Sequence, residues 1–176
     1  HADTIKMKGH VEERPVVDDF SGDTLRMAPD TIRTFYGIDN VRAYRTDVQG
    51  VCGLIIGCTR DSSMTMYQDP IVWTGQRQLF GDSIRCFMND STIREAHVMG
   101  NAFSIELMND GEHYNQVSSK LMNAYFVDGK IRWSEAISNV LIVYYPVDDK
   151  DSSLIGLNYT ETDTMRAYMT PEQKLE

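Results

Sequence analysis

Short alternating stretches of apolar and polar residues, separated by Asn, Asp, Gly and Ser, run along the chain from about residue 23 to residue 169. Alternation with a period of two is typical of β-strands that bury one face, and the spacing of amphipathic helices is almost absent. Four stretches are rich in the β-branched and aromatic residues that strands favour. They are VRAYR (41–45), PIVWT (70–74), AFSIEL (102–107) and VLIVYY (140–145). The sequence therefore predicts an all-β protein.

Each of these stretches follows an Asn or Asp, and the spacing of these residues indicates an internal repeat. The residues are Asn40, Asp69, Asn101 and Asn139, which by subtraction are 29, 32 and 38 residues apart. Asn and Asp side chains bond the backbone ahead of them and tolerate left-handed dihedral angles, so they suit turns. A tight turn and an Ile-Arg pair precede the last two of them, in DSTIREAHVMGN and DGKIRWSEAISN. We expect each unit to read strand, turn, strand, Asx turn, strand, which is a repeated β-meander.

The two-residue period of a strand decides which side chains share a face. When the units are superposed, Ile93 and Ile131 point inward, whereas Arg94 and Arg132 point outward. Outward Arg residues of this kind either contact lipid phosphates or simply solvate the sheet, and the second interpretation is favoured. The residues expected to line an apolar interior are Ile55, Ile84, Cys86, Met88, Ile93, Phe103, Ile105, Met122, Ala124, Phe126, Ile131 and Ile142.

Small residues occupy the middle inward position of the aligned strands, at Gly57, Cys86 and Ala124. Large and small side chains that alternate in this way either interdigitate in a packed core or leave a channel, and both interpretations stay open. Methionine usually fills gaps in a core, but it is also over-used on surfaces that adapt to flexible apolar ligands. Met88 and Met122 lie on the inferred inward face, which suits fatty chains.

The overall composition fits a folded domain and excludes some partners. The 176 residues, 41% of them hydrophobic, suit one core, and the net charge of -9 argues against nucleic acid, which needs clustered Lys and Arg. No window is apolar for the roughly 18 residues of a membrane helix, and the first residues lack the apolar core of a signal peptide. We expect residues 1–20 to be a partial strand or mobile arm and residues 21–176 to be a single domain.

Residue spacing offers no catalytic site. The four histidines, His1, His10, His97 and His113, lack the spacing of a zinc site or a catalytic dyad, and His97 is expected to be a half-buried sheet residue. The conspicuous acids Asp23, Asp82, Asp90 and Asp128 stand at turn positions, where they are expected to hold the backbone. A glycan hydrolase would need two carboxylates facing each other across a cleft, so it is the least favoured hypothesis. We expect no catalysis, cofactor or metal.

The chain has three cysteines, Cys52, Cys58 and Cys86, and an odd number cannot all pair internally. Buried free thiols are the preferred interpretation because Cys is often fully buried. A bridge between Cys58 and Cys86 is the alternative.

At the repeats the sequence resembles a known family. The resemblance is carried by the units FGDSIRCFMNDSTIREAHVMGNAFSIE and SSKLMNAYFVDGKIRWSEAISNVLIVYYP, and its shared pattern is Gly-Asp-x-Ile, a turn, then Gly-Asn before an outgoing strand. From about Gly22 to the C-terminus the chain is similar to the OstA-like family of periplasmic lipopolysaccharide-transport proteins of Gram-negative bacteria. It departs from the family's typical bridge in the insertions NDGEHYNQ (109–116) and PVDDKDSS (146–153), in its cysteines and in its irregular N-terminus.

The resemblance implies an elongated, twisted, open β-jelly roll or sandwich whose hydrophobic interior takes up the acyl chains of lipid A. It implies a non-catalytic periplasmic protein that carries or bridges lipopolysaccharide towards the outer membrane, without a cofactor. It also implies end-to-end assembly, with itself or with other β-jelly-roll proteins of the transport machinery, through free sheet edges. The alternative function is a structural or adaptor module that joins other proteins through its sheet edges while its interior is merely packed.

Overall fold

The computed structural model describes residues 6–15, 33–45, 48–89, 92–148, 150–151 and 153–172, and for residues 6–15 it describes the backbone alone. All regular elements in these ranges are strands, which confirms the all-β prediction. They are β1 (Lys6–Pro15), β2 (Arg33–Tyr44), β3 (Gln49–Cys58), β4 (Ser63–Tyr67), β5 (Ile71–Thr74), β6 (Arg77–Phe80), β7 (Ser83–Asn89), β8 (Thr92–Leu107), β9 (Tyr114–Val127), β10 (Lys130–Tyr144) and β11 (Asn158–Tyr168). The described residues contain no helix long and apolar enough to cross a membrane.

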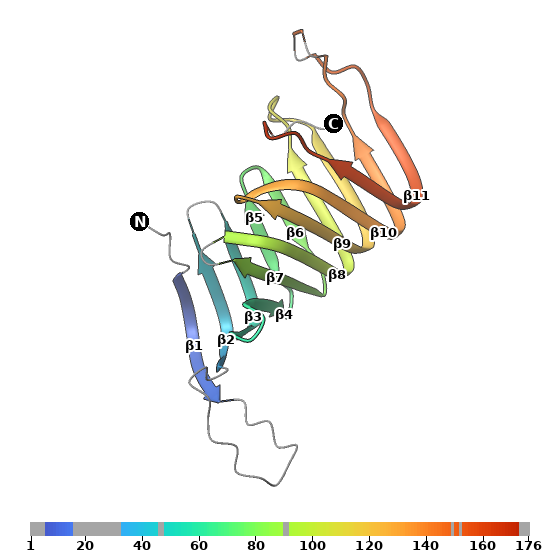
Figure 1. Cartoon of the computed structure of the whole chain (residues 1–176). Coiled ribbons are helices and arrows are strands. Elements are labelled where there is room, and N and C mark those ends of the chain that lie inside the picture. Colours follow the sequence, from blue (N-terminus) through green and yellow to red (C-terminus); the bar gives the residue numbers. More distant parts are fainter. Residues whose placement is uncertain are drawn as a thin grey trace.

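The eleven strands form one antiparallel sheet in which most neighbours in space are also neighbours in sequence (Figure 1). The order is β1-β2-β3-β4-β7-β8-β9-β10-β11, while β5 pairs with β3 and β6, and β6 also pairs with β8. Hydrogen bonding therefore closes a six-stranded antiparallel barrel through β3, β4, β7, β8, β6 and β5. The remaining strands extend the sheet outward from this ring, β1 and β2 beyond β3, and β9 to β11 beyond β8.

The ring closes because β3 and β8 are long and pair with different strands at their two ends. Residues 54–58 of β3 pair with β4, and residues 49–51 pair with β5. Residues 92–99 of β8 pair with β7, and residues 103–106 pair with β6. Each of these two strands thus belongs to both halves of a bent sheet.

The bends lie at the four Asn and Asp residues that mark the repeat in the sequence. Asn40, Asp69, Asn101 and Asn139 have φ angles of 52°, 56°, 47° and 54°. The residue before each one, Asp39, Gln68, Gly100 or Ser138, also has a positive φ. Two successive left-handed residues break the regular pleat, and the pairing register shifts at each of the three bends that lie within a strand. The predicted left-handed conformations are confirmed.

The expected end of a strand at each of these residues is wrong in three of the four units. Asn40, Asn101 and Asn139 lie inside β2, β8 and β10, which continue beyond the bulge in a new direction. Only Asp69 separates two strands, β4 and β5. The reason is that a bulge of left-handed residues leaves the flanking ladder hydrogen bonds intact, so it turns the strand without reversing it.

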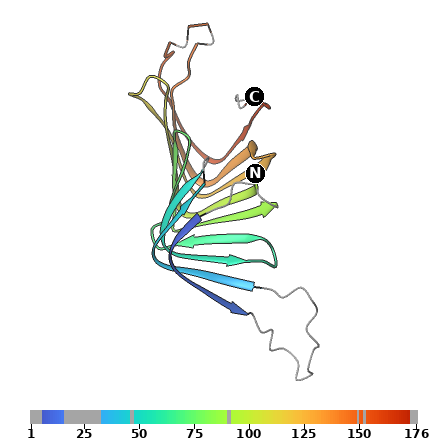
Figure 2. The same cartoon turned by 90° about the vertical axis from the view of Figure 1, so that its left-hand side faces the viewer.

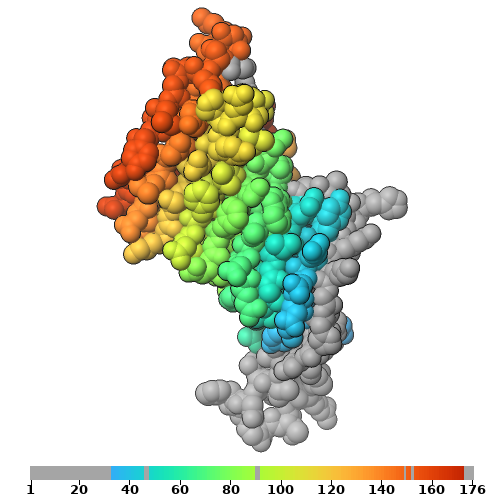
Figure 3. Space-filling view, turned by 180° about the vertical axis from the view of Figure 1, so that it is seen from behind, coloured from blue at the N-terminus to red at the C-terminus, as the bar shows by residue number. Residues whose placement is uncertain are grey.

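These aligned bends fold the sheet into a V with two limbs, seen edge-on in Figure 2, and its outer surface is seen in Figure 3. We call residues 33–38, 54–67, 83–89, 92–99, 121–137 and 164–168 the first limb. We call residues 41–45, 48–52, 71–80, 102–118, 140–148, 150–151 and 153–161 the second limb. The residues between them form the apex.

The hydrophobic core lies in the angle of the V, where the two limbs face each other. Ile55, Ile84 and Val98 come from the first limb, and Val41 and Val72 from the second, and all five are buried in one cluster. Burial of an aliphatic side chain of this size contributes about 1.5–3 kcal/mol. The core therefore holds the limbs together on the side of β2 to β8.

The tight turns agree with the prediction where they are described. Asp128 and Gly129 connect β9 to β10 with φ angles of 52° and 75°, the left-handed pair of a two-residue hairpin turn. Asp82 holds backbone at the corner between β6 and β7, where its N–H donates to the carbonyl of Gly100 at 2.8 Å. Asp23 and Asp90 lie outside the described residues.

The thiols of Cys52, Cys58 and Cys86 are free, as the preferred interpretation expects. A bridge between Cys58 and Cys86 is not formed, because the two residues lie on opposite faces of the sheet. Cys58 pairs with Ser63, whereas Cys86 pairs with Met64, the next residue on β4. Successive residues of a strand point to opposite faces.

Gly100 tests the importance of the corner beside β8. A Cβ at Gly100 would overlap the Asp82 side chain, whose carboxylate accepts a hydrogen bond from Asn101 Nδ2 at 3.0 Å. Gly111 also has a positive φ, of 74°, but a Cβ there meets open space. Both Gly→Ala changes incur the left-handed strain of about 1–2 kcal/mol, and Gly100→Ala should lose about 1–3 kcal/mol more through overpacking. Urea unfolding of both variants measures the difference, and equal losses would contradict it.

Candidate functional site

The pairing carries one row of inward side chains across eight neighbouring strands. The row consists of Gly37, Ile55, Met66, Ile84, Val98, Met122, Ala136 and Met165. Its first part packs into the core cluster, which fixes this face of the sheet as the concave one. The concave face of the first limb is therefore apolar along its whole length.

A second concave row, nearer the tip of the first limb, is made mostly of small residues. It consists of Phe35, Gly57, Met64, Cys86, Ala96, Ala124, Ser134 and Ala167. At the β3 end the space above the small residue is filled, because a Cβ at Gly57 would overlap the Phe35 ring. Towards β9 and β11 the row is formed by Ala and Ser alone, so the concave surface is lowered there.

Larger side chains flank this row at the tip of the limb. Met88 pairs with Ile93, and Phe126 pairs with Ile131. In register, the small residues therefore stand between these side chains at the tip and the row that contains Met122. We call this part of the concave face, on β7 to β11, the concave trough.

Ten of the twelve residues predicted to line an interior lie on the concave face. Ile55 and Ile84 are almost fully buried in the core, with 2% and 1% of their surface exposed. Cys86, Met88, Ile93, Met122, Ala124, Phe126, Ile131 and Ile142 are half-buried. The half-buried residues lie on β7 to β10, outside the fully buried part of the core. The concave trough is therefore less completely buried than the core.

Phe103 and Ile105 do not lie on this face. Ser104, which stands between them, pairs with Leu79, and Leu79 packs against the core cluster. Alternation along β8 then places Phe103 and Ile105 on the convex side, where the Phe103 and Phe80 ring centroids are 6.1 Å apart. The sequence pattern was misleading because the apolar residues of this stretch cover the outside of the second limb, while the small Ala102 and Ser104 face inward.

Burial changes the chemistry of the thiols on the concave side. It raises the pKa of Cys86 to about 11, although the positive charge of Arg45 acts in the opposite direction. It also raises the pKa of Cys52 to about 11. Since the thiolate is the reactive form, both residues stay protonated and inert at neutral pH.

The convex face of the first limb carries a polar network that the sequence did not reveal. Arg85 Nη2 donates a hydrogen bond to Asp61 Oδ2 at 2.7 Å. A hydrogen bond from the Ser63 side chain lowers the pKa of the Asp61 carboxyl most, and the positive charge of Arg85 lowers it further. His97 Nε2 lies 2.6 Å from Glu95 Oε1 with 26% of its side chain exposed, which confirms it as a half-buried sheet residue. The contact between Arg85 and Asp61 joins residues 24 positions apart, a separation that gives no signal in the sequence.

The same convex network continues to the last strand. Asn123 Nδ2 donates to Glu135 Oε1 at 3.0 Å, and Arg166 Nε donates to Glu135 Oε2 at 3.3 Å. Beside this network the rings of Tyr125 and Trp133 stack with centroids 3.9 Å apart. The side chains of this face are thus largely engaged with one another, as expected of a solvated outer surface.

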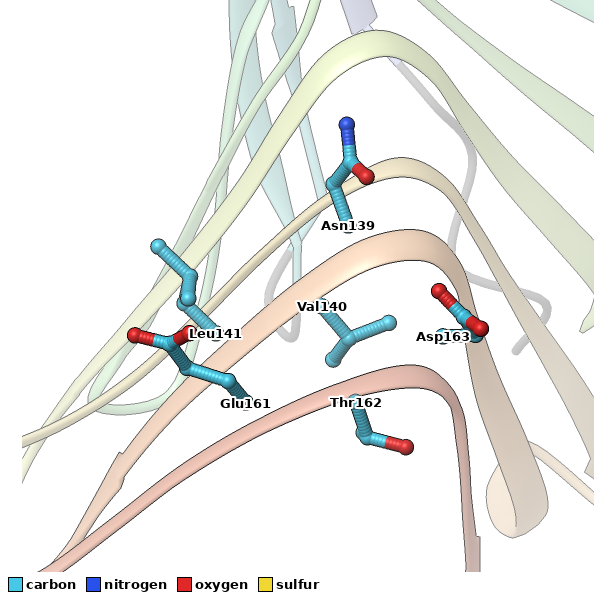
Figure 4. A pocket seen from close by; sticks show the side chains of 6 residues that line it. All are labelled: Asn139, Val140, Leu141, Glu161, Thr162 and Asp163. Carbon is cyan, nitrogen blue, oxygen red and sulfur yellow. The ribbon is translucent and has the colours of Figure 1, made fainter.

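A shallow hollow of about 420 Å³ lies at the apex between β10 and β11 (Figure 4). It is lined by Asn139, Val140, Leu141, Glu161, Thr162 and Asp163. Val140 and Thr162 point to the concave side of the bend, whereas Leu141 and Glu161 point away from it. Because the hollow is open and straddles the bend, it does not enclose a ligand. No group of three or more His, Cys, Asp or Glu side chains gathers as a metal site anywhere in the described ranges.

Comparison of the chain with protein-family models and with curated proteins finds no match.

The rate at which the Cys86 thiol is alkylated tests whether its surroundings on the concave face raise its pKa. In a Cys52→Ser/Cys58→Ser variant, the rate of Cys86 modification by iodoacetamide should rise about tenfold per pH unit between pH 8 and pH 10, because only the thiolate reacts and its pKa is about 11. Mass spectrometry of samples quenched over time measures this rate. A rate that levels off near pH 9 would show that Cys86 is not buried as described.

Proposed function

We propose that this protein is a non-catalytic, periplasmic lipid-binding module that carries or bridges lipopolysaccharide or a similar lipid. The acyl chains lie in the concave trough, and the V-shaped sheet is an elongated, open β-jelly roll built of repeated units. The observation that carries the proposal is the apolar concave face itself, which runs unbroken through eight strands in cross-strand register.

The state of burial along this face supports a ligand at β9 to β11. A side chain such as Ile84 at the core has 1% of its surface exposed, so it is already covered by the protein. Met122 and Phe126 are only half-buried. Apolar surface left in contact with water is stabilised when another apolar group covers it, by about 0.8 kcal/mol for each CH₂ that is buried. Several acyl chains would therefore supply most of the binding free energy without polar contacts.

The residues of the trough suit hydrocarbon rather than a rigid ligand. Met122, Met165 and Met88 are unbranched and adaptable, and such side chains follow the shape of a flexible chain. Ala124 and Ala167 form a floor along which a chain can lie close to the sheet.

The bends support the repeated, jelly-roll description of the sheet. In β2, β8 and β10 the same two-residue left-handed bulge stands at the same level of the sheet. Alternate strands thus carry one structural device at one height. This regularity fits the unit pattern on which the resemblance to the OstA-like family rests.

Met122→Asp tests the lipid site. Met122 is half-buried in the trough, so a carboxylate there should reduce the affinity for lipopolysaccharide and for a fluorescent long-chain fatty acid by at least about tenfold. Fluorescence titration measures the affinity, and circular dichroism checks that the sheet is retained.

Leu121→Asp is the matched control, because the neighbouring residue is also half-buried but pairs with Met99 and Ile137 on the convex side. It should leave the affinity unchanged. Binding that survives Met122→Asp, or that falls equally in both variants, would contradict a lipid site in the trough.

The adaptor function is supported by a different observation, the two edges of the sheet. Among the described residues β1 pairs only with β2, and β11 pairs only with β10, so each presents a row of free backbone groups. Such edges add strands from other chains through backbone hydrogen bonds.

Mass measurement separates the two functions. If the protein carries lipid, light scattering over a range of concentrations should show an assembly state that changes when lipopolysaccharide is added, and extraction should recover lipid from the protein. An oligomer that forms with concentration, ignores lipid and yields no lipid on extraction would favour the adaptor.

A further inference from the structure

The convex side of the second limb is apolar and almost uncharged, unlike the polar convex side of the first limb. Phe103 and Ile105 lie on it, and cross-strand pairing carries one row of side chains through each of them. The first row consists of Arg42, Val51, Ile71, Phe80, Phe103, Ser118, Leu141 and Glu161. The second row consists of Tyr44, Gln49, Trp73, Gln78, Ile105, Gln116, Val143 and Tyr159. We call these two rows the outer face.

Charged side chains stand only at the two ends of the first row of the outer face, Arg42 on β2 and Glu161 on β11. Every other side chain of the two rows is aliphatic, aromatic, hydroxyl or amide. Tyr44, Leu141 and Tyr159 have 54%, 42% and 59% of their surface exposed. Figure 3 looks onto this side of the sheet, where β3 to β10 follow one another and no other segment lies across them. A continuous apolar surface of this kind is rare on monomers and marks a contact site.

The order of side chains in the first row is self-complementary. Arg42 and Glu161 stand at its opposite ends, and Phe80 and Phe103 are neighbours at its middle, with ring centroids 6.1 Å apart. A two-fold axis that runs parallel to the strands, in front of this aromatic pair, turns the outer face of one copy onto that of a second copy and reverses the row. Arg42 then lies opposite Glu161 of the second copy, and the aromatic pairs of the two copies meet at the centre.

The outer face is also large enough for a stable dimer. It crosses eight strands, from β2 to β11. At a spacing of about 4.8 Å between strands and about 20 Å for six residues along each, its area is about 680 Å². Specific interfaces bury about 800 Å² on each partner, so contact over most of this face reaches nearly that size.

The two charges of the outer face favour a second copy over a charged partner. Arg42 and Glu161 are opposite in sign and stand at opposite ends of the row, so an acidic or a basic surface would attract one of them and repel the other. A second copy satisfies both at once. The other charges of the chain, whose net charge is -9, lie outside the two rows, which limits the repulsion between copies.

We propose that the outer face of the second limb is the interface of a two-fold symmetric dimer, in which two second limbs pack face to face as the layers of a β-sandwich. The inference goes beyond the proposed lipid function and does not depend on it, because the outer face lies on the opposite side of the sheet from the concave trough. It also differs from assembly through the free edges. Edge pairing uses the backbone groups of β1 and β11 and can continue from copy to copy, whereas a two-fold dimer is closed.

Sedimentation equilibrium over a range of protein concentrations should show a monomer–dimer equilibrium that stops at twice the monomer mass. Phe103→Lys should leave a monomer at every concentration at which the unchanged protein is a dimer, because it places two ammonium groups in the apolar centre. Circular dichroism checks that the variant keeps its sheet. A protein that stays monomeric, or whose mass keeps rising beyond the dimer, would overturn the proposal.

Charge reversal tests the two-fold arrangement without touching the apolar centre. Arg42→Glu and Glu161→Arg should each weaken dimerisation about five- to tenfold, because two symmetry-related attractions become repulsions. The double variant Arg42→Glu/Glu161→Arg should recover the affinity of the unchanged protein to within about twofold, since both pairs form again with their charges exchanged. A double variant as weak as either single variant would refute this arrangement.

Arg132→Glu is the matched control, because it makes the same change in net charge as Arg42→Glu at an exposed position of the first limb. It should dimerise as the unchanged protein does. A loss of affinity equal to that of Arg42→Glu would mean that association follows net charge alone, and the proposed interface would then be wrong.

Discussion

The shape of this protein depends on a local backbone constraint, the pair of left-handed residues that bends β2, β8 and β10 and that separates β4 from β5. Asn, Asp and Gly tolerate the left-handed conformation, whereas branched side chains are strained in it. A few residues therefore determine where each strand bends. Since the bends of neighbouring strands coincide, the sheet folds along a line instead of twisting as a flat ribbon. The two limbs then face each other, and their apolar faces bury a core in the angle between them.

The two faces of the first limb differ in chemistry: the convex face is polar and the concave face is apolar. On the convex side, polar side chains pair locally: Arg85 with Asp61, His97 with Glu95, and Asn123 with Glu135. On the concave side nearly all side chains are apolar, so their gain comes from exclusion of water. Where the opposite limb lies close, the protein itself supplies that exclusion; where it is farther away, at Met122 and Phe126, a hydrophobic ligand is proposed to supply it.

Much of this fold was predictable because its strongest signals are local. The alternating pattern predicted the strands, Asp128 and Gly129 predicted a hairpin, and Asn101 and Asn139 predicted left-handed residues. What the sequence could not show was that a left-handed pair can bend a strand without ending it, because that depends on the ladder partners on both sides. The convex network was hidden for the same reason, since Asn123 and Glu135 become neighbours only through register.

The candidate site was predicted less evenly than the fold. Alternation placed Ile84 and Met122 on the inward face because no bulge separates them from the other inward residues of their strands. Beyond the bulge of β8 the inward positions change from odd- to even-numbered or the reverse, so the alternation found before the bulge no longer holds. The prediction chose Phe103 as an inward residue because it is hydrophobic, whereas the small Ala102 is the buried one. A bulge therefore has to be located before side chains can be assigned to a face.

Because the left-handed bends recur on alternate strands, the cross-section of the V is set along the whole sheet and not by its ends. A further strand of the same kind lengthens the concave surface by about 4.8 Å and leaves its width unchanged. Capacity and selectivity are therefore separable quantities in this architecture. In the proposed lipid-binding function, the number of strands would govern how much hydrocarbon is accommodated, and a handful of residues at the bends would govern how broad a molecule can enter.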